Sequence, residues 1–145
     1  MSPAYCPLAP VSDAVVQALA ANVTLVQRAT GGISTDISEN PTFPFLWVEV
    51  DHAGDLGGFG TKPGRGAVPD VTVRLHVFQG NRGTLRDAQG LMALAIAVLA
   101  DPPAVSGYGR LGIFHESTLS LADQELRGVK VFEIVAQFRL LIEES

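Results

Sequence analysis

Residues 51–70, DHAGDLGGFGTKPGRGAVPD, are rich in glycine and carry the cations Lys62 and Arg65. Such a segment can bind phosphate when its backbone N–H groups lie at the N-terminus of a helix. A Walker loop, for example, needs Gly-Lys-Ser/Thr between a strand and a helix. This segment contains GTKPG instead and leads into a strand-like run, VTVRLHVF. We therefore expect a long loop that contacts another protein rather than a nucleotide site.

A second glycine-containing segment, GNRGTLRD at residues 80–87, does lie between a strand-like run and a helix-like run. Its N–H groups could hold an anion at the start of that helix. A tight turn followed by an N-cap at Thr84 and a capping-box partner at Asp87 explains the same residues. We favour the second interpretation.

The remaining reactive side chains form no recognisable catalytic or metal motif. His52, His76 and His115 are not at metal-ligand spacing, and Cys6 is the single cysteine. A zinc site would therefore need distant residues to converge. Glu116 follows His115, but neighbours on a strand point to opposite faces and do not readily cooperate. The sequence predicts no catalytic residue, no cofactor, no metal and no disulfide.

The composition indicates one domain that has partners. The chain has 145 residues, a net charge of −5 and 17% charged residues, below the roughly 25% of an average soluble protein. Low charge favours a surface covered by other subunits. Five of the ten cations lie between residues 62 and 86, where Asp70 is the only acid, so this part can be locally positive. No apolar run is long enough to span a membrane, no signal peptide is evident, and the single cysteine suits a reducing compartment.

Two helices are expected to position these residues. Prolines at 3, 7 and 10 predict an extended arm over residues 1–11. A single helix then follows from Ser12 to the glycines at 31–32, with an apolar stripe at intervals of three and four residues: Val15, Leu19, Val23 and Val26. The second helix runs from Thr84 to the prolines at 102–103 and is apolar around much of its circumference.

Four segments have the pattern of strands: residues 45–50, 71–78, 113–121 and the C-terminal run from 129. Between the last two we expect a polar loop. The expected fold is α+β, in the order α-β-β-α-β-β, within a single domain over residues 12–145. A four-stranded antiparallel sheet would carry both helices on one face, with the long loop between its first two strands. The other face would display these side chains: Trp47, Arg74, His76, Glu133 and Arg139.

Four stretches together resemble a known protein family. They are PFLWVEV, VTVRLHVFQG after the long loop, GTLRDAQGLMALAIAVLAD, and GIFHESTLSLADQELRGVKVFEIVAQFRLLIEE. The order of these stretches and their patterns of apolar and polar residues resemble those of the tail terminator, or tail completion, proteins of long-tailed bacteriophages and related phage-like particles. The resemblance covers nearly the whole chain after the arm and includes no invariant motif.

The resemblance implies a structural protein of the virion, assembled in the host cytoplasm. Members of the family form a ring, commonly a hexamer, at the head-proximal end of the tail tube. The ring stops tube polymerisation and offers a surface to head-completion proteins. The implied partners are other copies of the chain, the tail tube protein, head-completion or connector proteins and passing DNA, with no membrane, cofactor or catalysis.

Two groups of residues are expected to form interfaces. The first is the long loop, which would face the tube or the lumen: Asp55, Leu56, Phe59, Lys62 and Arg65. The second would lie at subunit contacts or along the channel: Trp47, Arg74, His76, Arg82, Glu133 and Arg139. A head-completion or neck protein, or another ring-forming tail protein, would fit the same features. From a different class, a small α+β ligand-binding domain or enzyme stays open.

Overall fold

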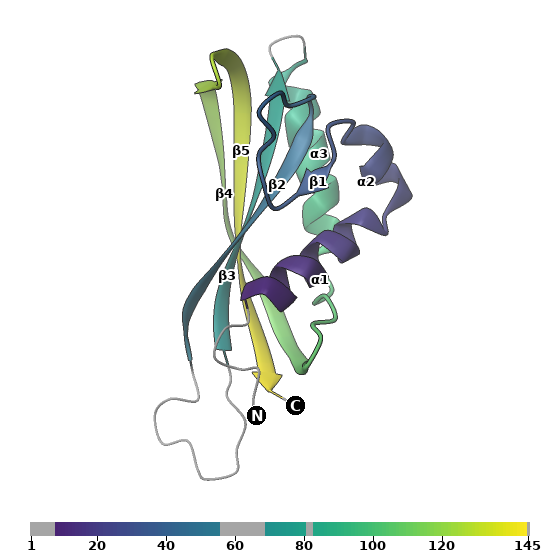
Figure 1. The fold of residues 1–145 in the computed structure, drawn as a ribbon, viewed down its shortest axis with the longest axis vertical. Helices are drawn as coiled ribbons and strands as arrows, with labels where there is room; N and C mark the ends of the chain where they lie inside the picture. The colour runs from purple at the N-terminus through teal and green to yellow at the C-terminus, as the bar shows by residue number, and fades with distance from the viewer. Residues whose placement is uncertain (1–7, 56–68, 81–82, 145) are drawn as a thin grey trace.

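In the computed structural model, three helices cover one face of a long, twisted sheet (Figure 1). The structure describes residues 8–55, 69–80 and 83–144. The helices are α1 (Leu8–Ala20), α2 (Val23–Arg28) and α3 (Leu85–Val98). The strands are β1 (Ile33–Ser34), β2 (Phe45–Asp55), β3 (Pro69–Gly80), β4 (Tyr108–Leu126) and β5 (Val129–Glu144). Among the described helices, none has the length and apolar character of a membrane span.

The sheet is mixed and has five described strands in the order β1-β2-β3-β5-β4. The expected four-stranded, wholly antiparallel sheet with two helices is therefore wrong. The additional strand, β1, pairs in parallel with β2 through Ile33 and Leu46. Two residues are too few to show an alternating pattern, so no signal in the sequence indicated β1. It is held by hydrogen bonds from Gly31 N to Pro44 O and from Leu46 N to Gly32 O.

The expected first helix is split in two at Asn22. Its side chain accepts a hydrogen bond from Leu25 N at 2.9 Å, which caps a new helix, α2, in the middle of the apolar stripe. Asparagine is a strong N-cap residue because its side chain competes for backbone N–H groups. The stripe divides accordingly: Val15 and Leu19 of α1 are buried, whereas Val23 and Val26 of α2 are exposed.

Residues 8–11 of the expected arm are not extended, because α1 begins at Leu8. Residues 8–11 are helical and Val11 is fully buried. Pro10 is tolerated there because the first four N–H groups of a helix have no intrahelical partner. Residues 1–7 lie outside the described part of the chain.

Strands β4 and β5 form a long hairpin where a short strand and a polar loop were expected. The turn consists of Arg127 and Gly128, both at positive φ (51° and 82°), as a tight two-residue hairpin turn requires. Three register shifts interrupt the pairing of β4 with β5. Each shift resets the alternation of side chains between the faces, which explains why the sequence showed only part of this strand.

The core lies between the helices and one face of the sheet. The expected apolar alternation of β3 and β5 is confirmed by this buried set: Val71, Val73, Leu75, Val77, Ile134, Ala136, Phe138 and Leu140. Leu91, Met92 and Ala95 of α3 pack against it. The expected capping box is also present, since Thr84 and Asp87 each bond the other's backbone N–H. The apolar alternation of β3 and β5 and the start of α3 therefore follow from local patterns in the sequence.

Candidate functional site

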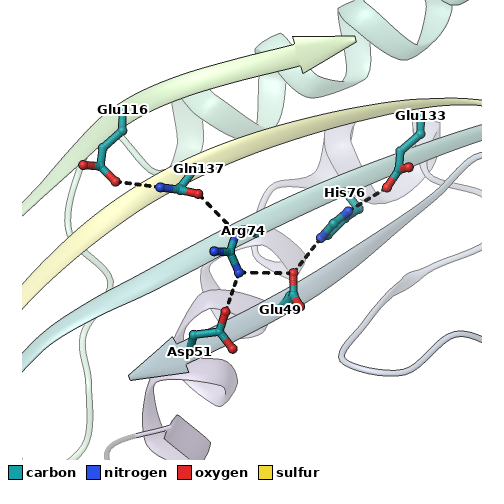
Figure 2. A network of polar contacts seen from close by, with 7 residues as sticks. All are labelled: Glu49, Asp51, Arg74, His76, Glu116, Glu133 and Gln137. Atoms are coloured by element: carbon teal, nitrogen blue, oxygen red, sulfur yellow. Dashed lines mark hydrogen bonds and ion pairs between the residues drawn. The ribbon is translucent and has the colours of Figure 1, made fainter. Parts of the chain in front are cut away.

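The face of the sheet turned away from the helices, called here the outer face, carries the candidate site. Strand alternation sends every second side chain to it. Its three central rows, read from β2 through β3 and β5 to β4, are Asp51, Thr72, Arg139 and Phe114; Glu49, Arg74, Gln137 and Ser117; and Trp47, His76, Val135 and Leu119. Polar side chains from all four strands meet there in one network (Figure 2).

His76 lies at one end of this network, between two carboxylates. Its Nδ1 is 2.7 Å from Glu133 Oε2 on β5, and its Nε2 is 3.0 Å from Glu49 Oε1 on β2. The His76 ring is buried, and it packs on the Trp47 ring with 4.3 Å between centroids. His76 therefore joins β2 to β5 across β3.

Arg74 forms the other half of the network. Its guanidinium donates to Asp51 and, through Nε, to Gln137 Oε1 at 3.1 Å. It also lies 3.7 Å from Glu49 Oε1, which connects it with His76. Gln137 in turn donates to Glu116 Oε1 at 3.0 Å. Glu116 lies where β4 shifts its register against β5. This irregularity in β4 places Glu116 on the outer face, where it is the last residue of the hydrogen-bonded series.

Arg139 and Asp70 form a separate ion pair on the same face. Arg139 Nε lies 2.8 Å from both carboxylate oxygens, and Nη2 lies 2.5 Å from Oδ2. The hydrogen bond and the charge of Asp70 raise the pKa of Arg139. The Asp70 side chain is mostly buried while Arg139 is 42% exposed, so the arginine shields the carboxylate from solvent.

One end of the outer face is apolar and covered. Phe45, Phe78 and Val131 are buried there, with the Phe45 and Phe78 rings stacked at 5.0 Å. The segment 35–44, called here the strap, covers this cluster. Hydrogen bonds from residues outside the strap hold it in place. Trp47 Nε1 donates to Thr35 O at 3.0 Å, and Arg127 donates to Ser38 O at 2.8 Å and to Ile37 O at 3.2 Å. At its other end, Thr30 Oγ1 donates to Phe43 O at 3.0 Å and Gly31 N donates to Pro44 O at 2.8 Å.

The geometry of the network suits a structural surface. Both nitrogens of His76 lie within hydrogen-bond distance of carboxylates that belong to neighbouring strands. Three hollows of about 280, 300 and 220 Å³ occur elsewhere on the described surface, and no network residue lines any of the three. No cluster of side chains in the described ranges is placed to hold a metal ion. The network has four carboxylates for Arg74 and His76, so it is an acidic surface.

The structure brings together several of the predicted site residues. Trp47, Arg74, His76 and Glu133 lie side by side, and Arg139 is in the row next to Arg74. Asp55 ends β2. The other predicted residues lie outside the described part of the chain: Leu56, Phe59, Lys62, Arg65 and Arg82.

Sequence reasoning missed the carboxylates and the amide that neutralise or bond the cations: Glu49, Asp51, Asp70, Glu116 and Gln137. Glu49 and Gln137 had a usable signal, since they share the strand period of Trp47 and Arg139. Their pairing with Arg74 required the register of three strands, which no local pattern contains.

No protein-family model matches the chain, and no curated protein matches it. Solved structures do match. A chain in the virion of a native gene transfer agent particle superimposes with a TM-score of 0.76 at 20% identity, covering 97% of this chain and 99% of that one. The gp17 protein of bacteriophage SPP1 superimposes with a TM-score of 0.55 at 15% identity, covering 95% and 94%. The chain shares the fold of both proteins over nearly its whole length.

Proposed function

We propose that this chain is a structural protein of a tailed phage or phage-like particle, and that it forms a ring at the head-proximal end of the tail tube. The ring ends tube polymerisation and offers the head a joining surface. One observation carries the proposal: the likeness to a chain of the gene transfer agent virion covers 97% of this chain and 99% of the other.

The outer face gives a physical reason for an assembly role. Three strands are joined across this face by hydrogen bonds and ion pairs whose partners lie 23 to 63 residues apart in the sequence. Such cross-links hold the surface in one shape before a partner arrives, and preorganisation lowers the cost of association. A ring subunit needs this property because its neighbours must meet it at a fixed angle for the ring to close.

The long loop is proposed to contact the tube or the lumen. It leaves β2 at Asp55 and returns to β3 at Pro69, which are paired in the sheet. These strand ends lie at the opposite end of the elongated molecule from the β4–β5 turn (Figure 1). We place the proposed contact with the tube or the lumen at this end of the molecule. Lys62 and Arg65 would then meet acidic groups on the partner.

The ion pairs of the outer face limit which cations could contact passing DNA. Arg74 bonds Asp51 and Gln137, and Arg139 bonds Asp70, so neither guanidinium is free for phosphate. Carboxylates exceed cations in this network, and an acidic surface repels DNA. Among the cations predicted to lie at an interface, this leaves Lys62, Arg65 and Arg82 as the proposed DNA contacts. Charge reversal at Arg74 should therefore change folding rather than DNA passage.

The proposal is tested with the tail tube protein of the same particle. We expect tubes polymerised with the purified chain to be shorter and capped at one end by an annulus in negative-stain images. Tubes polymerised without it should grow to uncontrolled lengths. Equal tube lengths in both samples, with no annulus at any concentration of the chain, would contradict the proposed function.

A further inference from the structure

A row of aromatic rings on the outer face connects the polar network with the strap. The His76 ring packs on Trp47 with 4.3 Å between centroids, and it stacks with Phe78 at 6.2 Å. Phe78 in turn stacks on Phe45 at 5.0 Å, and the Phe45 ring lies 5.6 Å from that of Phe43. Because Phe43 belongs to the strap, the row runs from the centre of the network to the last part of the strap.

Trp47 makes a second connection, at the first residue of the strap. Its indole N–H donates to Thr35 O at 3.0 Å, while its ring packs on His76. The indole is rigid, so the ring cannot shift on His76 without moving its own N–H. His76 is thus connected with both ends of the strap, through one ring to Thr35 and through two rings to Phe43.

The position of His76 depends on two carboxylates (Figure 2). Glu133 Oε2 and Glu49 Oε1 lie 2.7 and 3.0 Å from its two ring nitrogens. Hydrogen bonds to ionised carboxylates are roughly twice as strong as bonds between neutral groups, so these two contacts fix the orientation of the ring. The Glu133 side chain is 13% exposed and that of Glu49 is 33% exposed. Glu49 is therefore the carboxylate that solvent and partners can reach.

The strap lacks the dense packing of the core. Its residues are all exposed or half-buried, and the hollow of about 280 Å³ is lined by Ile37 and Pro41 of the strap together with Phe45. Side chains that border such a space have no contacts on one side. Movement of the strap would uncover Phe45, Phe78 and Val131, which are at most 5% exposed.

We propose that the carboxylate contacts of His76 and the strap form one conformational latch, in which His76 and Trp47 are positioning residues. While both contacts are made, the strap stays closed over Phe45 and Phe78. Loss of either contact lets the imidazole turn and loosens the hold of Trp47 on the strap. A cationic group of a partner that binds Glu49 draws it from His76 and opens the latch. The latch lies within one copy of the chain, so it does not depend on the proposed ring.

The indole N–H of Trp47 reports the state of the latch, because Trp47 is the single tryptophan of the chain. We expect Glu133→Ala to raise its hydrogen-exchange rate, measured by NMR, by about three- to tenfold, as for residues coupled through shared contacts. Glu49→Ala, which imitates the withdrawal of that carboxylate, should raise it similarly. Glu133→Gln keeps the shape and one acceptor oxygen, so it should give a smaller rise.

Two controls separate opening of the latch from general destabilisation. Amide exchange of Val73 and Leu75 in the core of β3 should stay at the wild-type rate in each variant, since local opening leaves the core closed. Arg139→Gln removes a cation of the same face whose described hydrogen bonds go to Asp70. It should leave the exchange of the indole N–H unchanged.

A double-mutant cycle tests whether the coupling passes through Trp47. Trp47→Phe keeps a ring on His76 but removes the N–H that bonds Thr35. Amide exchange of residues 35–44, measured by mass spectrometry, reports the strap in every variant. We expect the increase caused by Glu133→Ala to be smaller in the Trp47→Phe background than in the wild type, because that hold on the strap is already lost.

Two results would overturn the latch. The first is an indole N–H that exchanges at the wild-type rate in both Glu133→Ala and Glu49→Ala. The second is full additivity of Glu133→Ala and Trp47→Phe in the exchange of the strap, since independent effects exclude a shared connection. Neither result bears on the proposed ring, which is tested separately by the length of the tubes.

Discussion

The Nδ1 atom of His76 and the Oε2 atom of Glu133 lie 2.7 Å apart, although 57 residues separate them in the sequence. Glu49 approaches the other nitrogen of the same ring at 3.0 Å. The imidazole is thus the centre of a carboxylate–imidazole–carboxylate row that runs across three strands. We expect this row to hold the outer face together.

Removing the imidazole should destabilise the protein strongly. His76→Ala leaves Glu49 and Glu133 without their shared partner, and it leaves a gap under Trp47. Loss of a hydrogen bond to a charged group costs about 1.5–3 kcal/mol, and we expect the free energy of unfolding to fall by at least that amount. Urea denaturation measures it. Thr24→Ala, at an exposed position of α2, is the control and should change it little. A loss for His76→Ala no larger than for the control would show that the row contributes nothing.

The Arg139–Asp70 ion pair should contribute little to the free energy of unfolding, and this contribution should not change between neutral and moderately alkaline pH. Arg139 is partly exposed, and solvent-exposed ion pairs contribute little to stability because water screens the charges. Because Asp70 raises the pKa of Arg139, the contribution of this arginine is complete below its unfolded pKa and is lost only as strongly alkaline pH is approached. We expect the difference in stability between wild type and Arg139→Gln to be constant from neutral to moderately alkaline pH. A difference that shrinks steadily over that interval would contradict this assignment.

Gly31 should tolerate no side chain. A Cβ built there would lie 1.7 Å from Thr42 O and 2.8 Å from Phe45 Cβ. Gly31→Ala must therefore push the strap away from β2, and overpacking of this kind costs about 1–3 kcal/mol or more. Gly109→Ala is the matched control, because its Cβ would meet nothing closer than Glu143 O at 3.8 Å. Thermal melting should show a large decrease for the first variant and a small change for the second.

Arg127 should control the mobility of the strap. Arg127→Ala removes the hydrogen bonds to Ser38 O and Ile37 O, while the core of the domain stays intact. We expect faster amide hydrogen exchange in residues 35–44 and unchanged exchange in β3. Arg127→Gly removes the same two hydrogen bonds, but glycine adopts the positive φ at this position without strain. Its strap should therefore exchange as fast as that of Arg127→Ala, while the whole domain should be more stable. Slow exchange of the strap in both variants would mean that the hydrogen bonds from Trp47, Thr30 and Gly31 hold it without Arg127.

Deletion of Leu56–Arg65 should leave the domain folded and weaken its docking to the tail tube. The pairing of β2 with β3 is complete at Asp55 and Pro69, so the sheet does not require the deleted residues. Circular dichroism should be unchanged, and binding to preformed tubes in a pelleting assay should fall. A deletion variant that aggregates or melts far below wild type would show that the loop stabilises the domain.

The candidate site shows where sequence reasoning ends. Trp47, Arg74, His76 and Glu133 were predicted to share a face because strand alternation places them there, and the structure brings them together. Which of them pair, and with what, was not predictable. Glu116 joins the network only because β4 shifts its register, and a bulge leaves no clear pattern in one sequence.

The sequence by itself determined two local features: α3 with its capping box at Thr84, and the alternating cores of β3 and β5. Each depends on residues within one or two turns or along one strand, so periodicity and capping suffice. Only the tertiary structure decided the rest: the parallel strand β1, the break at Asn22 that exposes Val23 and Val26, and the ion pairs of the outer face. Those features depend on contacts between segments that are distant in the sequence. The geometry of such contacts is set by how the strands pair and not by neighbouring residues in the chain.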